Sequence, residues 1–174
     1  IKSAREFAVL SLDRILRESW NPDGKQDGSL HRVVAYGDGQ KPAKPVQGML
    51  DDYAALGLAC VDAWEATADL RYYHHAESLA NAMIARFYDS ASGGFFDTAQ
   101  NASASEPLGV LAAQRKPLQD SPTPAGNSLA AILLLRLAEL SGRADWKEKA
   151  ENTLKAFAAV AEQFGLYAGA YGLA

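Results

Sequence analysis

Cysteine is almost absent from the sequence. Cys60 is the single cysteine among 174 residues, so neither a disulfide nor a paired-thiol redox motif can form within the chain. Because Cys60 stands between Leu58 and Val61 in an apolar segment, we interpret it as a small core residue and not as a reactive thiol.

Clusters of positive charge and long apolar runs are also missing. The net charge is −4 and the basic residues are dispersed, so no basic stripe is present to hold a phosphate backbone or an anionic membrane. The longest apolar run, from Leu129 to Leu135, is far shorter than the ~20 residues that span a bilayer, and no charged-then-apolar leader opens the chain. We therefore expect a soluble, cytoplasmic protein that binds neither nucleic acid nor membrane.

Several catalytic signatures are missing as well. The sequence has no glycine-rich phosphate loop, no aspartate-rich DDxxD run and no G-x-S-x-G nucleophile turn, which excludes the commonest forms of nucleotide, terpene and α/β-hydrolase chemistry. His74 and His75 are adjacent, whereas two ligands on one helix face need a spacing of three or four residues. We expect no metal site and no cofactor.

What the sequence does contain is a helical repeat. Segments 72–83 and 146–157 match at an offset of 74 residues (146 − 72), and segments 4–15 and 76–87 match at an offset of 72 (76 − 4). Charged residues mark these three segments, which predicts half-exposed outer helices over residues 3–20, 71–88 and 145–163. Between them, residues 49–67 and 127–141 are apolar nearly all round, which predicts buried inner helices.

Buried and half-exposed helices in strict alternation predict an all-α fold, and within it an α/α toroid. The chain would form one partial toroid domain over residues 1–174, with short β-hairpin insertions in the long connections at 21–48 and 89–126. Both connections lead from an outer helix to the start of an inner helix, so we expect them at the same end of the array. Long loops on a rigid scaffold, beside unpaired helix N–H groups, are typical of a binding site.

Three motifs carry a resemblance to a known family. Met49-Leu50-Asp51-Asp52-Tyr53-Ala54, Gly93-Gly94-Phe95-Phe96 and the segment 120–128 (DSPTPAGNS) resemble the thioredoxin-domain-containing family of the spermatogenesis-associated type, over nearly the whole chain. The resemblance implies a toroid similar to N-acylglucosamine 2-epimerases and six-hairpin glycosidases, joined in the family to a thioredoxin-like domain.

Three residues are candidates for catalysis at the end of the array where the inner helices begin. Asp51 and Asp52 open the first inner helix about 100° apart, so one is expected to cap the helix and the other to face the cavity. We assign the cavity to Asp52, which matches the family motif, and Asp120 approaches the second inner helix from the same end. Two carboxylates are the minimum equipment for glycoside cleavage, and His31 could exchange protons near neutral pH. The alternatives are a helix cap, a structural loop aspartate and a plain surface histidine.

Four further residues are candidates for substrate binding: Arg32, Tyr53, Phe95 and Asn127. Tyr53 and Phe95 could stack on a sugar ring, although aromatic residues at such spacings are equally typical of a core. Asn127 could instead cap the leucine-rich inner helix.

The sequence thus favours a carbohydrate-active or carbohydrate-binding segment, with glycosidase-like or epimerase-like chemistry if it is an enzyme. The alternative is a non-catalytic interaction module that holds a thioredoxin-like domain. Since an open arc leaves apolar inner helices uncovered, we also expect the chain to self-associate as a homodimer.

Overall fold

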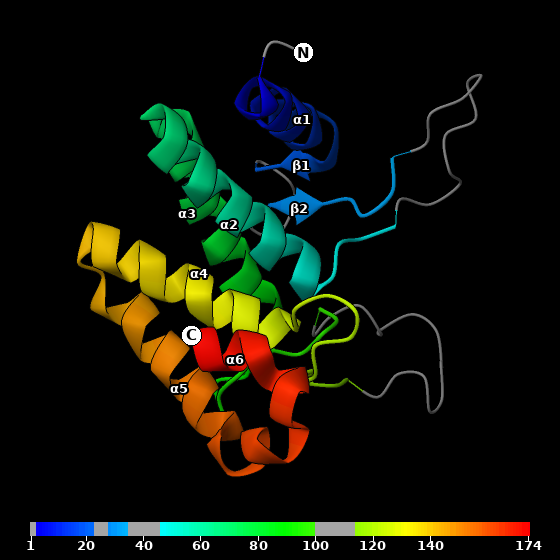
Figure 1. Cartoon of the computed structure of the whole chain (residues 1–174), viewed down its shortest axis with the longest axis vertical. Coiled ribbons are helices and arrows are strands. Elements are labelled where there is room, and N and C mark those ends of the chain that lie inside the picture. Colours follow the sequence, from blue (N-terminus) through cyan, green and yellow to red (C-terminus); the bar gives the residue numbers. More distant parts are fainter. Residues whose placement is uncertain (1–2, 23–27, 35–45, 100–113) are drawn as a thin grey trace.

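Long helices make up most of the structure. The computed structural model describes residues 3–22, 28–34, 46–99 and 114–174 (Figure 1). Its five long helices have ends within two residues of the expected ranges: α1 (Ala4–Ser19), α2 (Leu50–Thr67), α3 (Leu70–Phe87), α4 (Gly126–Ser141) and α5 (Ala144–Ala161). The expected all-α class is confirmed.

The remaining elements are short. The 3₁₀ helix η2 (Glu162–Ala168) and the helix α6 (Gly169–Leu173) end the chain. Strands β1 (Trp20–Asn21) and β2 (Ser29–Leu30) pair antiparallel, with Trp20 opposite Leu30. Isolated bridges join His31 to Gln47 and Tyr88 to Phe95. β2 and the His31–Gln47 bridge lie within the connection 21–48 and β1 lies at its start, where a short β-hairpin was expected.

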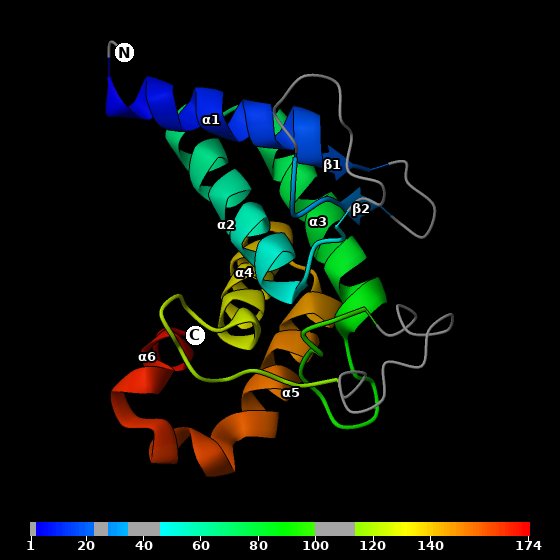
Figure 2. The ribbon, with the colours of Figure 1, turned by 90° about the vertical axis from the view of Figure 1, so that its right-hand side faces the viewer.

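Two antiparallel helical hairpins form the body of the fold (Figures 1 and 2). The α2–α3 link is minimal because Ala68, at φ 58°, ends α2 and the carboxylate of Asp69 at once caps α3 by accepting the Arg71 N–H at 3.0 Å. The α4–α5 link turns at Gly142, whose φ of 72° suits a residue without a Cβ. Short links hold each pair of helices side by side.

The core lies where α2 packs between α3 and α4. A Cβ added to Gly57 of α2 would stand 2.5 Å from Cδ2 of Leu133 in α4, so the two helices approach closely at this point. Leu133 is fully buried, as are Cys60, Val61, Leu79 and Leu134. The contact between α2 and α4 therefore joins one hairpin to the other.

Helix α1 lies across one end of the first hairpin (Figure 2). Its buried side chains are Leu12 and Leu16, and the Tyr72 hydroxyl donates a hydrogen bond to Asp13 at 2.7 Å. The buried Trp20 follows α1 and packs edge-on against Tyr53.

In the described ranges, none of the helices is both long and apolar enough to cross a membrane.

A leucine at position 57 tests the close approach of α2 and α4. We expect Gly57→Leu to lower the free energy of unfolding by about 1–3 kcal/mol, because the new side chain must displace Leu133 from a filled core. Urea denaturation measures the change. Ala55→Leu, on the exposed side of the same helix, is the matched control and should leave the midpoint nearly unchanged; equal effects at both positions would contradict the assignment.

Candidate functional site

The described parts of the two long connections meet at the start of α2. The Leu50 N–H donates to the Asp97 carbonyl at 3.0 Å, and the Asp97 N–H donates to the Arg115 carbonyl at 2.7 Å. On the other side, the Gly48 N–H donates to the Leu30 carbonyl at 2.7 Å. Within the described residues, both connections therefore reach the end of the array where the inner helices begin. Residues 23–27, 35–45 and 100–113 of these connections lie outside the described part.

A pocket of about 220 Å³ opens at this end, between the starts of α2 and α4. Two carboxylates, Asp51 and Asp97, belong to its lining, together with the exposed side chains of Gln119, Ser121 and Thr123. The remaining wall is made by residues of both helix starts and of the second connection: Met49, Leu50, Pro117, Pro124, Ala125 and Gly126. The pocket thus combines hydrogen-bonding groups with apolar surface at two helix N-termini.

The adjacent aspartates divide the two expected roles in the reverse order. Asp52, which we assigned to the cavity, accepts the Met49 N–H at 2.9 Å and so caps α2. Asp51 lines the pocket instead. The reason is helical geometry, because the third helical residue is the one whose carboxylate reaches back to the residue before the helix.

Arg32 joins these aspartates from the first connection. Its Nη1 lies 3.4 Å from Oδ1 of Asp51 and 3.1 Å from Oδ2 of Asp52. All three side chains are partly exposed, so each ion pair contributes at most ~1 kcal/mol to stability. Arg32 therefore brings a positive charge beside the pocket's acidic edge without becoming part of the core.

Tyr53 lies in the core and not in the pocket. Its side chain is almost fully buried between Trp20 and Phe87, and its hydroxyl oxygen accepts the Leu30 N–H at 2.9 Å. Burial raises the pKa of the Tyr53 phenol above its ordinary value. The ring of Tyr53 is closed to solvent. Because its hydroxyl accepts the Leu30 N–H, Tyr53 joins β2 to α2.

Asn127 fixes the second connection to the start of α4. Its Oδ1 accepts the Phe95 N–H at 2.7 Å, and its Nδ2 donates to the carbonyls of Phe95 and Pro117 at 3.0 Å each. Asn127 and Phe95 are both buried, and the Phe95 ring packs edge-on against Tyr88. Both residues form the floor beneath the connection, and neither presents a side chain to the pocket.

Asp120 and His31 are not among the residues that line the pocket. Oδ1 of Asp120 accepts the Ala125 N–H at 2.7 Å, and Oδ2 accepts the Ala170 N–H at 2.8 Å. This carboxylate thus joins the residue before α4 to the start of α6. His31 is half-exposed, and its backbone N–H donates to the Ser19 carbonyl at 2.9 Å. Among the described residues, no hydrogen bond or ion pair joins the side chains of Asp52, Asp120 and His31.

Sequence reasoning missed Asp97, the second carboxylate of the pocket. Asp97 follows Phe96 in an irregular segment, and nothing in its local pattern separates it from other loop aspartates. Its position depends on the ladder of hydrogen bonds from Leu50 to Arg115. The proximity of Asp97 to a glycine turn before a buried aromatic residue was the available signal.

An ion pair closes the second connection at its base. Nζ of Lys116 lies 2.6 Å from Oδ2 of Asp89 and also donates to the Ser92 hydroxyl at 2.7 Å. Both side chains of the pair are about four-fifths covered. The ammonium of Lys116 and the hydroxyl of Ser92 hold the pKa of the Asp89 carboxyl well below its usual range. The ion pair therefore ties the residues that follow α3 to those that precede Pro117.

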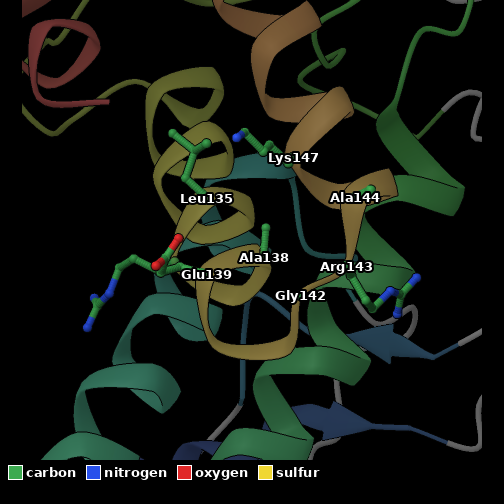
Figure 3. A pocket seen from close by; sticks show the side chains of 8 residues that line it. Leu135, Ala138, Glu139, Gly142, Arg143, Ala144 and Lys147 are labelled. Carbon is green, nitrogen blue, oxygen red and sulfur yellow. The ribbon is translucent and has the colours of Figure 1, made fainter.

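A second pocket, of about 510 Å³, lies at the opposite end of α4 (Figure 3). It is lined by Arg136, Glu139, Arg143 and Lys147 among smaller residues. Arg136 binds Asp62 and Glu65, and Arg143 binds Asp145 and stacks on Trp146. Because these guanidinium groups already have partners, we place the candidate site in the pocket of about 220 Å³, where the long connections converge.

No trio of His, Cys, Asp or Glu side chains in the described ranges could hold a metal ion.

Comparison with known proteins identifies relatives. The chain is 30% identical to human spermatogenesis-associated protein 20 over 161 residues, which are 86% of this chain and 20% of that protein. It is 32% identical to the rat and mouse proteins of the same name over 133 residues, or 75% of this chain and 16% of each relative. No protein-family profile matches the chain.

The chain is therefore homologous to part of spermatogenesis-associated protein 20, and the expected relationship is confirmed as far as this homology. It spans about a fifth of the length of the curated relatives that it matches.

Removal of the Asn127 amide tests its role as a floor for the connection. We expect Asn127→Ala to lower the free energy of unfolding by about 2–4 kcal/mol, because it leaves a buried N–H and two carbonyls without partners. Urea denaturation gives the value. Asn81→Ala, on the exposed side of α3, should change stability little. A similarly small loss at position 127 would mean that water replaces the amide.

The Asp89–Lys116 pair predicts a loss of stability in acid. The folded pKa of Asp89 lies below its unfolded value of ~4. The stabilisation is therefore complete above about pH 4 and is lost as the pH falls toward the folded pKa. The urea midpoint of Asp89→Asn should lie below that of the natural chain at pH 7, and the two midpoints should converge below about pH 4. A constant difference across this pH range would show that the charge is not responsible.

Proposed function

We propose that this chain is a segment of an α/α toroid and that its pocket at the starts of α2 and α4 binds a carbohydrate. The observation that carries the proposal is the lining of that pocket, in which Asp51 and Asp97 stand beside hydroxyl and amide side chains and an apolar wall. Carboxylates accept hydrogen bonds from sugar hydroxyls, while hydroxyl and amide side chains can donate and accept.

The size of the pocket favours a small ligand. Its volume of about 220 Å³ is below the ~300–1,000 Å³ of sites for drug-sized molecules. A single sugar unit fits this size better than an oligosaccharide. α2 and α4 begin at Leu50 and Gly126, which both line the pocket. The positive ends of two helix dipoles therefore lie at the same wall, which suits the ring and hydroxyl oxygens of a sugar.

Binding, and not bond cleavage, is the activity that these contacts favour. Asp52 and Asp120, two of the expected catalytic residues, have carboxylates that already accept backbone N–H groups. A general acid or base needs its proton-transferring atom within reach of the substrate. Asp51 and Asp97 each accept one backbone N–H as well, through Oδ1, but unlike Asp52 and Asp120 they line the pocket. They are the side chains through which we expect the pocket to recognise a ligand.

A second candidate function rests on the segment 114–125. This segment supplies Pro117, Gln119, Ser121 and Thr123 to the pocket lining, so it lies over the helix starts and narrows access to them. A covered end favours an interaction module that holds a thioredoxin-like domain, the partner that the family resemblance implies. Under this alternative the same exposed side chains would contact protein and not sugar.

Titration with a defined sugar distinguishes the two. We expect N-acetylglucosamine to shift the backbone amide signals of residues lining the pocket in heteronuclear NMR spectra, and Asp51→Asn and Asp97→Asn each to weaken the affinity about tenfold, because each removes a charged acceptor. Glu148→Gln, an exposed carboxylate on α5, is the matched control. Absence of shifts at the pocket with N-acetylglucosamine, N-acetylmannosamine and methyl glucoside would refute sugar binding, and shifts caused by a thioredoxin-like domain would support the second candidate.

A further inference from the structure

Helix α1 exposes a broad apolar face. Phe7 is 56% exposed, Leu10 is 67% exposed and Ile15 is 46% exposed. Ala4 and Ala8 are exposed as well. Several exposed apolar side chains on one helix are typical of a contact surface.

The sequence repeat identifies the residues of α3 that correspond to this face. At the offset of 72, the exposed residues Ala4, Phe7, Ala8, Leu10 and Ile15 correspond to Ala76, Leu79, Ala80, Ala82 and Phe87. All five of these α3 residues have a relative exposure of 0%. Conversely, the buried Leu12 and Leu16 of α1 correspond to Ile84 and Tyr88, which are only partly buried. The same positions of the repeat are covered in α3 and open in α1.

The neighbour that covers this side of α3 is α2. The two helices run antiparallel through a two-residue link, and their contact is the most extensive between helices in the structure. The Tyr53 and Phe87 ring centroids lie 5.3 Å apart near one end, and those of Trp64 and Tyr73 lie 5.7 Å apart near the other. α4 and α5 repeat the arrangement, since α5 packs along α4 and its Trp146 and Ala150 lie in one core with Leu133 of α4. In both hairpins a largely apolar helix lies on the outer helix that follows it.

We propose that the exposed face of α1 is the docking surface for an apolar helix of the α2 kind, which lies antiparallel on Ala4, Phe7, Leu10 and Ile15 as α2 lies on α3. The occupant is a helix with apolar and small residues around most of its circumference, like α2 and α4. Its aromatic or aliphatic residues would pack on Ile15 as Tyr53 packs on Phe87.

A second copy of this chain does not supply such a helix. In each copy α2 and α4 are already packed in their own hairpins, so their apolar sides are not free. Among the described residues, the large apolar side chains that are exposed lie on α1, at Val33, Val46 and Leu70, near the ends of α4 and α5, and in η2 and α6. α2 contributes none of them. The homodimer expected through the inner helices therefore lacks the apolar surface that it would need on α2.

An extended chain tests the proposal. Residues 1–3 are replaced by a copy of residues 46–75, so that the copied His75 takes the position of Ser3 and the register of the repeat is kept. Phe7→Cys reports the exposure of the face by its rate of reaction with a thiol reagent. The natural Cys60 does not interfere, because it is buried and its pKa is raised to about 12; in the copy it is changed to Ala.

The control extension carries Tyr53→Glu and Trp64→Glu in the copy, at the two positions that face the outer helix in the natural hairpin. We expect the thiol at position 7 to react at least about tenfold more slowly in the extended chain than in the unextended chain, since the reagent must await a local opening. The control extension should restore the original rate.

Equal rates with and without the extension would overturn the proposal. So would protection in the unextended chain that grows with protein concentration, together with a dimer in light scattering, because a second copy would then cover α1. Protection that appears only with the extension, in a monomeric chain, supports the docking of an inner-type helix.

Discussion

The close contact between α2 and α4 is the constraint on which the arrangement of both hairpins depends. Each hairpin is held together locally by a two-residue link, but this link does not fix the position of one hairpin relative to the other. Gly57 supplies the missing relation, because only a residue without a side chain admits Leu133 at this depth. Since α2 and α4 are fixed to each other there, their N-termini open at a common end, and the candidate pocket forms between them.

The helices could be predicted from the sequence because their signals are local. The apolar stretch from Leu129 to Leu135 indicates a buried helix whatever its neighbours are, and the charges on α5 indicate a half-exposed one. The site was harder to predict because its geometry is not local. Which of Asp51 and Asp52 caps α2 depends on where the helix begins, and a shift of one residue exchanges the roles. Asp97 reaches the pocket only through hydrogen bonds to residues 47 and 18 positions away.

Aromatic and amide residues show the same limit. Tyr53 and Asn127 lie in the first turns of α2 and α4. A side chain at either position could contact a ligand or lie in the core, and the sequence pattern does not distinguish the two. In the structure each satisfies backbone groups of a connection, Leu30 for Tyr53 and Phe95 for Asn127. Buried polar groups must find partners, and here the partners belong to irregular segments that no periodicity describes. Tyr53 and Asn127 therefore hold the connections in place and do not line the pocket themselves.

The carboxylate of Asp120 has a consequence for how the last part of the chain behaves. One side chain accepts N–H groups from Ala125 and Ala170, which are 45 residues apart (170 − 125), and its own N–H donates to the Tyr167 carbonyl at 2.6 Å. Fraying of η2 and α6 would thus strip partners from the segment that leads into α4, and disorder in that segment would release the C-terminal helix. The two regions are expected to open as one cooperative unit, so that mobility at the C-terminus is transmitted directly to the wall of the pocket.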